Sequence, residues 1–289
     1  MVLRVILTNY YAILVKILFI KSKSFKMNKK LTITSIKKAK GVKPLVMITA
    51  YDALFAKLLQ ESADMILVGD SLNMSFGGKN DTLSITLDQM IYHTNAVCNG
   101  APNSFVVCDM PFGTYTNKED ALKNAVKVFQ ETPADCVKIE GGEEKAEIVK
   151  HLTSNGIAVC GHIGLLPQAF RSEGGYKVKG KNEAQTAQLI KDAQTIESAG
   201  AFCIVVEGVK ADVAAEITKS VNVPVIGIGA GADVDGQVLV FSDMLGFYEA
   251  FTPKFVKKYL DGASLVKEAV KNYADEVVAK EFPKEEHTY

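Results

Sequence analysis

Six short runs rich in β-branched residues end on side chains that could do chemistry or on a glycine turn. A continuous apolar run is typical of a buried parallel strand. In a barrel of such strands, functional side chains gather at the C-terminal ends. The sequence therefore predicts one rim that carries carboxylates, a lysine, a histidine and a further glutamate. The residues at the six ends are Asp70 with Ser71, Asp109, Lys138 with Glu140, His162, Glu207 and the turn 229–231.

Three of these side chains are carboxylates on different expected strands: Asp70, Asp109 and Glu140. Hard oxygen ligands suit Mg²⁺, which takes few protein ligands and completes its shell with water and substrate oxygens. No histidine pair has the spacing of zinc ligands, so zinc is not expected. The alternative is that the three acids are unrelated and cap helices or pair with lysines.

Strand alternation decides where Lys138 and His162 point. Lys138 is two residues before Glu140, so both face the same side of the strand. In a cavity shared with the carboxylates, Lys138 can hold an anionic substrate; the alternative is an ordinary surface Lys–Glu pair. His162 is two residues after Cys160, and both are expected to point inward. His162 is then either a catalytic side chain or a hydrogen-bonded core histidine.

Glu207 ends an apolar run and has no basic residue close behind it before Lys210. Burial of an isolated carboxylate at such a strand end would raise its pKa, which suits a general base. The alternative is a glutamate at the start of a helix, where it complements the helix dipole.

Two glycine-rich segments have separate interpretations. The turn 227–231 follows a strand and could cradle a phosphate, but no capped helix and no ribose-binding acid stand at the required spacing. Segment 174–180 has no strand directly before it. It is either a mobile cover over the rim or a plain surface loop.

Strand and helix patterns alternate with short linkers, which predicts an α/β fold with a parallel sheet closed into a (β/α)8 TIM barrel. The first strand is expected at 45–49. An eighth at 238–241 follows the seventh after only about nine residues, too few for a normal crossover helix. No repeat or linker divides the chain, so a single domain is expected, with amphipathic C-terminal helices from about 252 packing outside the barrel. Further expected elements are helices at 52–62, 87–99, 118–131, 144–155, 183–199 and 212–220, and a loop at 73–81.

Composition fits a soluble cytoplasmic enzyme. The 289 residues are 48% hydrophobic and 23% charged, as in ordinary globular proteins. Thirty-three basic and 33 acidic residues leave no net charge, so no nucleic-acid partner is expected. The cysteines show no CxxC spacing and are expected to be buried, reduced and unpaired. They are Cys98, Cys108, Cys136, Cys160 and Cys203.

The N-terminal segment differs from the rest of the chain. Residues 1–51 contain eleven Lys or Arg and no Asp or Glu. The uncharged run Val5–Val15 is too short to cross a bilayer, which takes about 20 residues, so no membrane association is expected. A secretory signal would need a small-residue cleavage site, and a transit peptide more Ser and Arg. We expect Met27 to be the native start, residues 1–26 to be a non-native or disordered extension, and 27–289 to form the catalytic barrel.

Five short motifs follow one another in a recognisable order. They are Val68-Gly69-Asp70-Ser71, Val137-Lys138-Ile139-Glu140-Gly141-Gly142, Gly161-His162-Ile163-Gly164-Leu165, Gly174-Gly175-Tyr176-Lys177-Val178 and Ile226-Gly227-Ile228-Gly229-Ala230-Gly231. Together they resemble the ketopantoate (3-methyl-2-oxobutanoate) hydroxymethyltransferase family, from about Thr32 to Pro253-Lys254-Phe255. The resemblance implies a Mg²⁺-dependent barrel of the phosphoenolpyruvate/pyruvate type, a homodecamer, and 5,10-methylenetetrahydrofolate as one-carbon donor.

The resemblance also implies roles for the strand-end residues. Asp70, Asp109 and Glu140 would ligate the metal, and Glu207 would accept a proton. The residues that would bind the α-keto acid are Asp70, Ser71, Asp109, Lys138 and His162.

Several positions depart from the family pattern. Asn73 stands where Gly is usual, and Ser84 where Pro is frequent. Leu166 replaces a frequent Thr, and Cys98-Asn99 replaces basic residues. None coincides with an implied ligand, so the departures bear on loop rigidity and folate contacts rather than on activity.

The implied reaction transfers a hydroxymethyl group to 3-methyl-2-oxobutanoate and gives 2-dehydropantoate through a Mg²⁺-stabilised enolate. One alternative is a lyase or mutase of the phosphoenolpyruvate mutase and isocitrate lyase type, which shares this enolate chemistry. Ala158-Val159 before Cys160 lacks the lysines of that group. The other alternative is a non-catalytic barrel, which would have no reason to place six polar groups on one rim.

Overall fold

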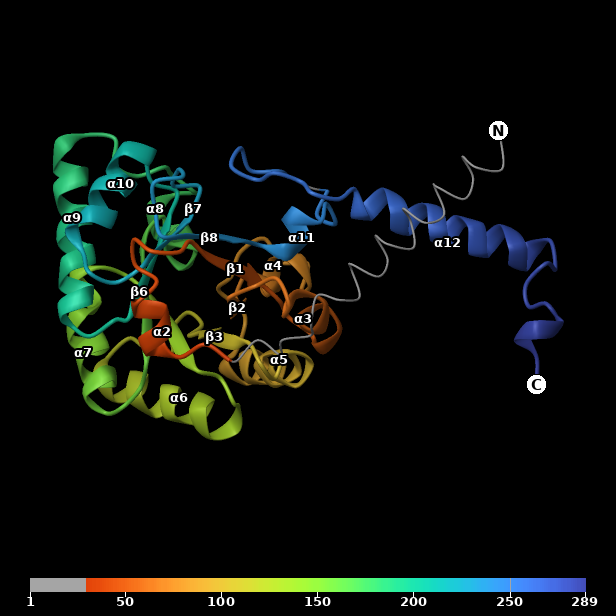
Figure 1. Ribbon diagram of the computed structural model, residues 1–289, viewed down its shortest axis with the longest axis horizontal. Coiled ribbons are helices and arrows are strands. Elements are labelled where there is room, and N and C mark those ends of the chain that lie inside the picture. The colour runs from red at the N-terminus through yellow and green to blue at the C-terminus, as the bar shows by residue number, and fades with distance from the viewer. Residues whose placement is uncertain (1–29, 250) are drawn as a thin grey trace, which may run out of the picture.

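A computed structural model describes residues 30–249 and 251–289 (Figure 1). Eight parallel strands form a closed barrel in sequence order, because β8 pairs with both β7 and β1. The expected (β/α)8 barrel is confirmed; the expectation for residues 1–26 lies outside the described residues. The strands are β1 (Leu45–Thr49), β2 (Met65–Val68), β3 (Phe105–Asp109), β4 (Cys136–Glu140), β5 (Val159–Gly164), β6 (Cys203–Glu207), β7 (Val225–Ile228) and β8 (Gly236–Leu239).

Helices cover the outside of the barrel and agree with the expected ranges to within a few residues. Several begin at a side chain that caps them: Asp52, Asn117 and Asn182 each accept a hydrogen bond from the N–H three residues on. The covering helices are α3 (Ala53–Leu59), α5 (Leu87–Gly100), α6 (Lys118–Glu131), α7 (Ala146–Ser154), α9 (Glu183–Ser198) and α10 (Ala211–Ser220). Shorter helices are α2 (Ile33–Lys37), η1 (Glu143–Lys145), η2 (Pro167–Ala169), α8 (Phe170–Glu173), α11 (Phe241–Met244) and η3 (Glu285–His287).

Strand side chains alternate between two hydrophobic clusters, one between strands and helices and one inside the barrel. The inner cluster includes Val107, Cys136, Cys160 and Val205. The residue two positions after each of these faces the barrel interior as well, and these later residues are the polar ones at its C-terminal end: Asp109, Lys138, His162 and Glu207. All five cysteines are buried and free, as expected.

The eighth strand begins two residues earlier than expected. β8 is Gly236–Leu239 rather than 238–241, and Phe241 already begins α11. A strand of four residues is about 13 Å long. Seven residues could span up to about 23 Å if they were fully extended, so the bent segment 229–235 is long enough to return from β7 without a helix. Asp235 fixes the start of β8, since its Oδ2 accepts from Val225 N–H at 2.9 Å and from Lys40 Nζ at 2.8 Å.

The expected packing of C-terminal helices on the barrel was wrong. The long helix α12 (Gly262–Val278) runs away from the barrel (Figure 1), and only Gly262 and Ala263 in it are buried. Its apolar side chains Leu265, Val270 and Tyr273 are 52–60% exposed. The amphipathic pattern was real, but its apolar face does not meet this chain's barrel. None of the described helices combines the length and apolar character needed to span a membrane.

The segment expected as a loop at 73–81 starts inside a short helix, α4 (Leu72–Ser75). Asn73 is buried there, and its Nδ2 donates to Asp81 O at 2.7 Å and to Ser84 Oγ at 3.0 Å. Two of the positions that depart from the family pattern, Asn73 and Ser84, therefore contact each other.

This contact predicts coupled stability effects. Asn73→Ala is expected to lower the free energy of unfolding by about 1–3 kcal/mol, because the buried partners lose their donor. The double variant with Ser84→Ala is expected to cost less than the two single changes together, since they remove one shared hydrogen bond. Urea unfolding followed by circular dichroism measures both, and strictly additive losses would contradict the contact.

Candidate active site

Strand alternation gathers the predicted side chains at one end of the barrel interior. Asp109 pairs in register with Lys138, and Glu140 with His162, on neighbouring strands. Asp70, Asp109, Lys138, Glu140 and His162 are only 2–4% exposed. Their side chains are thus taken out of water together, which concentrates charge in one small region. The alternative of an exposed Lys138–Glu140 surface pair is wrong.

The turn after β2 fixes Asp70 and Ser71. Gly69 allows the turn, because a Cβ there would lie 2.8 Å from Ser71 Oγ. The backbone N–H of Asp70 donates to Asp109 Oδ2 at 3.0 Å. Ser71 Oγ lies 2.8 Å from the hydroxyl of the buried Tyr51, so one of these hydroxyls donates to the other. The ends of β1, β2 and β3 are joined by these bonds.

Two buried carboxylates each keep one oxygen without a hydrogen-bond donor. Asp109 Oδ2 accepts from the backbone N–H of Asp70, and Glu140 Oε2 accepts from that of Gln168 at 3.0 Å. The other oxygens, Asp109 Oδ1 and Glu140 Oε1, are buried and have no hydrogen-bond partner. Each of these oxygens faces a nitrogen of the cluster: Asp109 Oδ1 lies 3.2 Å from Lys138 Nζ, and Glu140 Oε1 lies 3.5 Å from His162 Nδ1. Buried anionic oxygens in this state fit a cation, which can satisfy them without a proton.

The kind of cation follows from how the oxygens are arranged. Within residues 30–249 and 251–289, no group of three or more His, Cys, Asp or Glu side chains is arranged to hold a metal ion on its own. A closed structural zinc site has four protein ligands, whereas Mg²⁺ is commonly held by one or two carboxylates with waters and substrate oxygens. Asp109 and Glu140 could each offer a carboxylate oxygen to a Mg²⁺ ion whose remaining ligands are waters and substrate oxygens.

Burial and mutual repulsion set the charge of this cluster. Burial raises the pKa of Asp70 well above its usual value, and the charges of Asp109 and Glu140 raise it further. Burial also raises the pKa of Asp109, although the charge of Lys138 opposes this. Burial lowers the pKa of Lys138, but the three carboxylates outweigh it and the net shift is upward. Lys138 therefore stays an ammonium, and a second cation would relieve the remaining repulsion.

His162 lies between Lys138 and Glu207. Its Nδ1 is 3.0 Å from Lys138 Nζ, and its Nε2 is 3.3 Å from Glu207 Oε2. Burial and the charge of Lys138 lower the pKa of His162, but contacts with Glu140 and Glu207 outweigh them and raise it to about 9. The two alternatives from the sequence, a catalytic side chain or a hydrogen-bonded core histidine, do not exclude each other. His162 is buried and hydrogen-bonded, and it also belongs to the cluster of charged side chains.

Glu207 is the most accessible of the four predicted site carboxylates, the others being Asp70, Asp109 and Glu140. Its side chain is 20% exposed, against 4% for Glu140. It ends β6, and α10 begins only at Ala211, so the alternative of a helix-start glutamate does not hold. An accessible carboxylate beside this buried cluster is placed to exchange a proton with a bound molecule.

Sequence reasoning missed three residues that contact the cluster: Tyr51, Tyr115 and Gln168. Tyr51 follows β1 by two residues, so the strand-end rule that found the other residues could have found it. Tyr115 lies in the connection after β3 and Gln168 in η2, within the connection after β5, and Tyr115 OH donates to Gln168 Oε1 at 2.5 Å. Only the tertiary fold brings these two loops together.

A family model described as ketopantoate hydroxymethyltransferase matches residues 30–285. The chain belongs to this family. It is 77% identical over 263 residues to a 3-methyl-2-oxobutanoate hydroxymethyltransferase from Sulfurimonas denitrificans, covering 91% of this chain and 100% of that one. A protein of the same name from Helicobacter pylori is 52% identical over 261 residues, covering 90% and 97%. The resemblance drawn from five motifs is confirmed, and the chain is an enzyme rather than a non-catalytic barrel.

Solved structures support the type of barrel that this family was expected to have. Phosphonopyruvate hydrolase in complex with oxalate and Mg²⁺ has a TM-score of 0.57 at 13% identity, covering 86% of this chain and 88% of that chain. A 2,3-dimethylmalate lyase of the phosphoenolpyruvate mutase/isocitrate lyase superfamily has a TM-score of 0.54 at 16% identity, covering 89% and 92%. These likenesses show a shared fold. The sequence family is the hydroxymethyltransferase one, so the lyase or mutase alternative is not supported.

The two glycine-rich segments of the hydroxymethyltransferase pattern have structural explanations. A Cβ at Gly229 would lie 2.8 Å from the ring of Phe255, and one at Gly231 would lie 2.5 Å from Ala211 Cβ. Both have positive φ, so close packing and turn geometry account for them without a phosphate. In segment 174–180, Tyr176 OH lies 3.7 Å from Met74 Sδ of α4, so this segment contacts the loop after β2.

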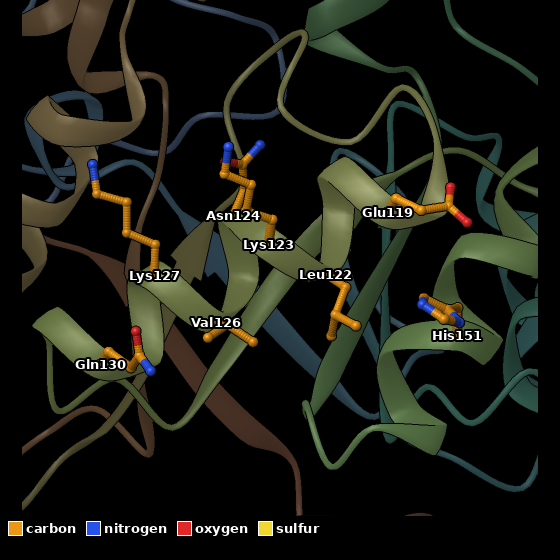
Figure 2. Close-up of a pocket in the computed structure, with 8 residues that line it drawn as sticks. All are labelled: Glu119, Leu122, Lys123, Asn124, Val126, Lys127, Gln130 and His151. Atoms are coloured by element: carbon orange, nitrogen blue, oxygen red, sulfur yellow. The ribbon is translucent and has the colours of Figure 1, made fainter.

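A separate cavity of about 570 Å³ lies on the outside of the barrel between α6 and α7 (Figure 2). Its lining mixes apolar and charged side chains of both signs, all exposed or half-buried. It has none of the buried, unpaired oxygens of the barrel end, so the hydroxymethyltransferase site is not placed there. The lining residues are Glu119, Leu122, Lys123, Asn124, Val126, Lys127, Gln130 and His151.

Proposed function

We propose that this chain transfers a hydroxymethyl group from 5,10-methylenetetrahydrofolate to 3-methyl-2-oxobutanoate and forms 2-dehydropantoate, with Mg²⁺ as cofactor. Family membership supports the reaction. The main support for the site is a pair of buried oxygens, Asp109 Oδ1 and Glu140 Oε1, that make no hydrogen bond. The ammonium of Lys138 lies beside them, 3.2 Å from Asp109 Oδ1. An anionic α-keto acid and a divalent cation together complement this arrangement of charge.

Asp70 and Asp109 would hold the Mg²⁺ ion, with Glu140 as the third acidic member of the site. When bound, the ion would act as a Lewis acid on the α-keto acid. The ammonium of Lys138 attracts the substrate's negative charge, and the hydroxyl of Ser71 is available to hydrogen-bond its oxygens. Because Tyr51 hydrogen-bonds Ser71, the hydroxyl is held in place before the substrate binds.

Glu207 would accept the proton from C3 of the substrate. It is the most accessible of the four candidate site carboxylates, and its Oε2 lies 3.3 Å from His162 Nε2. His162 can hold Glu207 in position through this contact. Water releases the one-carbon unit from the folate at the oxidation level of formaldehyde, which breaks its two C–N bonds and leaves tetrahydrofolate. C3 of the substrate then forms a bond to that carbon, whose oxygen takes up a proton and becomes the hydroxyl of the product. Lys138 opposes the negative charge that develops on the substrate oxygen.

Segment 174–180 would cover the substrate once it is bound. Its backbone is joined to the end of β6, because Lys179 N–H donates to Gly208 O at 2.8 Å. The ring of Tyr176 in this segment packs at a tilt against Phe170, with ring centroids 4.7 Å apart, and its hydroxyl reaches α4. A cover that excludes water would protect the enolate from protonation by solvent.

The chain would act in the cytoplasm as a self-associating protein, a homodecamer. The exposed apolar side chains of α12 support self-association, because such a face is stabilised by contact with another surface. Light scattering on the purified protein would give the mass, and a monomer at micromolar concentration would contradict this part of the proposal.

Deuterium exchange at C3 of 3-methyl-2-oxobutanoate tests the enolate step without folate. We expect the protein with Mg²⁺ in deuterated buffer to remove the C3–H signal from the proton NMR spectrum, and EDTA to stop the exchange. Exchange at the rate of buffer alone would contradict the proposed chemistry.

A further inference from the structure

Gln168 joins the ends of three adjacent strands. Its Nε2 donates to Asp70 Oδ2 at 2.8 Å and to Met110 O at 3.0 Å. Its backbone N–H donates to Glu140 Oε2 at 3.0 Å. Asp70 follows β2, Met110 follows β3 and Glu140 ends β4, and Gln168 itself is only 9% exposed. A single buried residue therefore contacts two of the three carboxylates.

Tyr115 fixes the orientation of the Gln168 side-chain amide. Its hydroxyl donates to Gln168 Oε1 at 2.5 Å, which leaves both amide N–H groups for Asp70 and Met110. A glutamine side chain offers two donors and one acceptor group, and all are used here. Burial raises the pKa of Tyr115 well above its usual value, so its hydroxyl keeps its proton and remains a donor.

The segment between β5 and Gln168 places this residue over the C-terminal end of the barrel. Gly164 has φ +98°, and a Cβ there would lie 2.4 Å from Glu207 O. The next residue, Leu165, donates its N–H to that same oxygen at 2.8 Å. Pro167 then opens η2, where Gln168 sits. The loop thus starts against β6 and ends against the strands that carry the acidic residues.

We propose that Gln168, oriented by Tyr115, is a positioning residue that holds Asp70 and Glu140 in the arrangement that receives the metal and the α-keto acid. This inference rests on the proposed function of the same site. A neutral amide suits the task because it donates two hydrogen bonds without adding charge. A glutamate at this position would face Asp70 with a second carboxylate, and a methionine would leave Asp70 and Met110 without their donor.

Gln168→Met tests the proposal, since the side chains are similar in size and only the hydrogen bonds are lost. We expect the affinity for Mg²⁺, measured by calorimetry, to fall by about 10–100-fold, as is typical when a partner that orients a metal ligand is removed. Tyr115→Phe is expected to lower it by about tenfold or less, because the amide keeps its bonds to Asp70 and Met110. Gln188→Met is the matched control: it removes an exposed Gln–Asp hydrogen bond of 2.9 Å on α9 and is expected to leave the affinity unchanged.

Unfolding without metal gives a second readout that a merely space-filling glutamine would not produce. Gln168→Glu is expected to lower the melting temperature strongly, because two carboxylates then meet at a buried contact. In the Asp70→Asn chain the same change is expected to cost much less, since the asparagine amide can donate to the new carboxylate. Equal losses in the two chains would overturn the proposed contact.

The outcomes separate this inference from the proposed function. If the unaltered protein binds no Mg²⁺ and exchanges no C3 proton, the proposed function fails. If it does both, and a folded Gln168→Met protein binds Mg²⁺ with unchanged affinity, the proposed role of Gln168 alone fails. A 10–100-fold loss with circular dichroism like that of the unaltered protein supports it.

Discussion

Asp109→Asn is expected to abolish Mg²⁺ binding and hydroxymethyl transfer while leaving the barrel folded. The asparagine keeps an oxygen for the N–H of Asp70, which now donates to Asp109 Oδ2 at 3.0 Å. It removes the charge from Oδ1, the buried oxygen that has no hydrogen-bond partner. We expect the Mg²⁺ affinity to fall by more than about 100-fold, because a direct ligand contributes more than a residue that only orients one.

Asp70→Asn is expected to have the same effect on Mg²⁺ binding. Without metal its melting temperature should equal or exceed that of the unaltered protein, because burial and two neighbouring carboxylates raise the pKa of Asp70 and so oppose its charge. Asp88→Asn serves as the control, since the side chain of Asp88 is 79% exposed on α5. Calorimetry that finds undiminished Mg²⁺ affinity in either site variant would contradict the metal assignment.

Glu207→Gln is expected to slow C3–H exchange of 3-methyl-2-oxobutanoate by about 10²–10⁴-fold, the usual contribution of a general base. The amide is nearly the same size, and Glu207 is not among the proposed Mg²⁺ ligands. Binding of Mg²⁺ and of the keto acid should therefore persist. Proton NMR in deuterated buffer measures the exchange, with the unaltered protein and buffer alone as references.

A purely structural role for Glu207 gives a different result. Its Oε2 contacts His162, so a bracing carboxylate would, on removal, lower the melting temperature and leave exchange nearly unchanged. Glu216→Gln is the matched control. It makes the same chemical change on α10, the helix that follows β6, and is expected to leave the exchange unchanged. Unchanged exchange in Glu207→Gln would move the base elsewhere, and His162 would be the next candidate.

Most of the site could be predicted because its geometry is local to each strand. An apolar run fixes a buried strand, and a period of two then fixes which later residue faces inward: Cys136 leads to Lys138 and Glu140, and Cys160 leads to His162. The closed parallel barrel brings all C-terminal strand ends together. Residues far apart in sequence could therefore be placed near one another once each was assigned to a strand end.

The remaining features depend on contacts that no local pattern encodes. Gln168 reaches Asp70 across 98 positions of sequence, and its partner Tyr115 lies in another loop. The apolar stripe of α12 predicted an amphipathic helix correctly, but a stripe does not say which surface covers it. The early start of β8 follows from the short return 229–235, which a rule based on crossover helices excludes.

Transfer of a labelled carbon tests the central claim most directly. The protein is incubated with 3-methyl-2-oxobutanoate, Mg²⁺ and 5,10-methylenetetrahydrofolate carrying ¹³C in the methylene group, and the products are analysed by NMR and mass spectrometry. We expect ¹³C in the hydroxymethyl group of 2-dehydropantoate, and loss of that product when EDTA replaces Mg²⁺. Absence of labelled 2-dehydropantoate would contradict the proposed reaction, and its undiminished formation in EDTA would contradict the role of Mg²⁺.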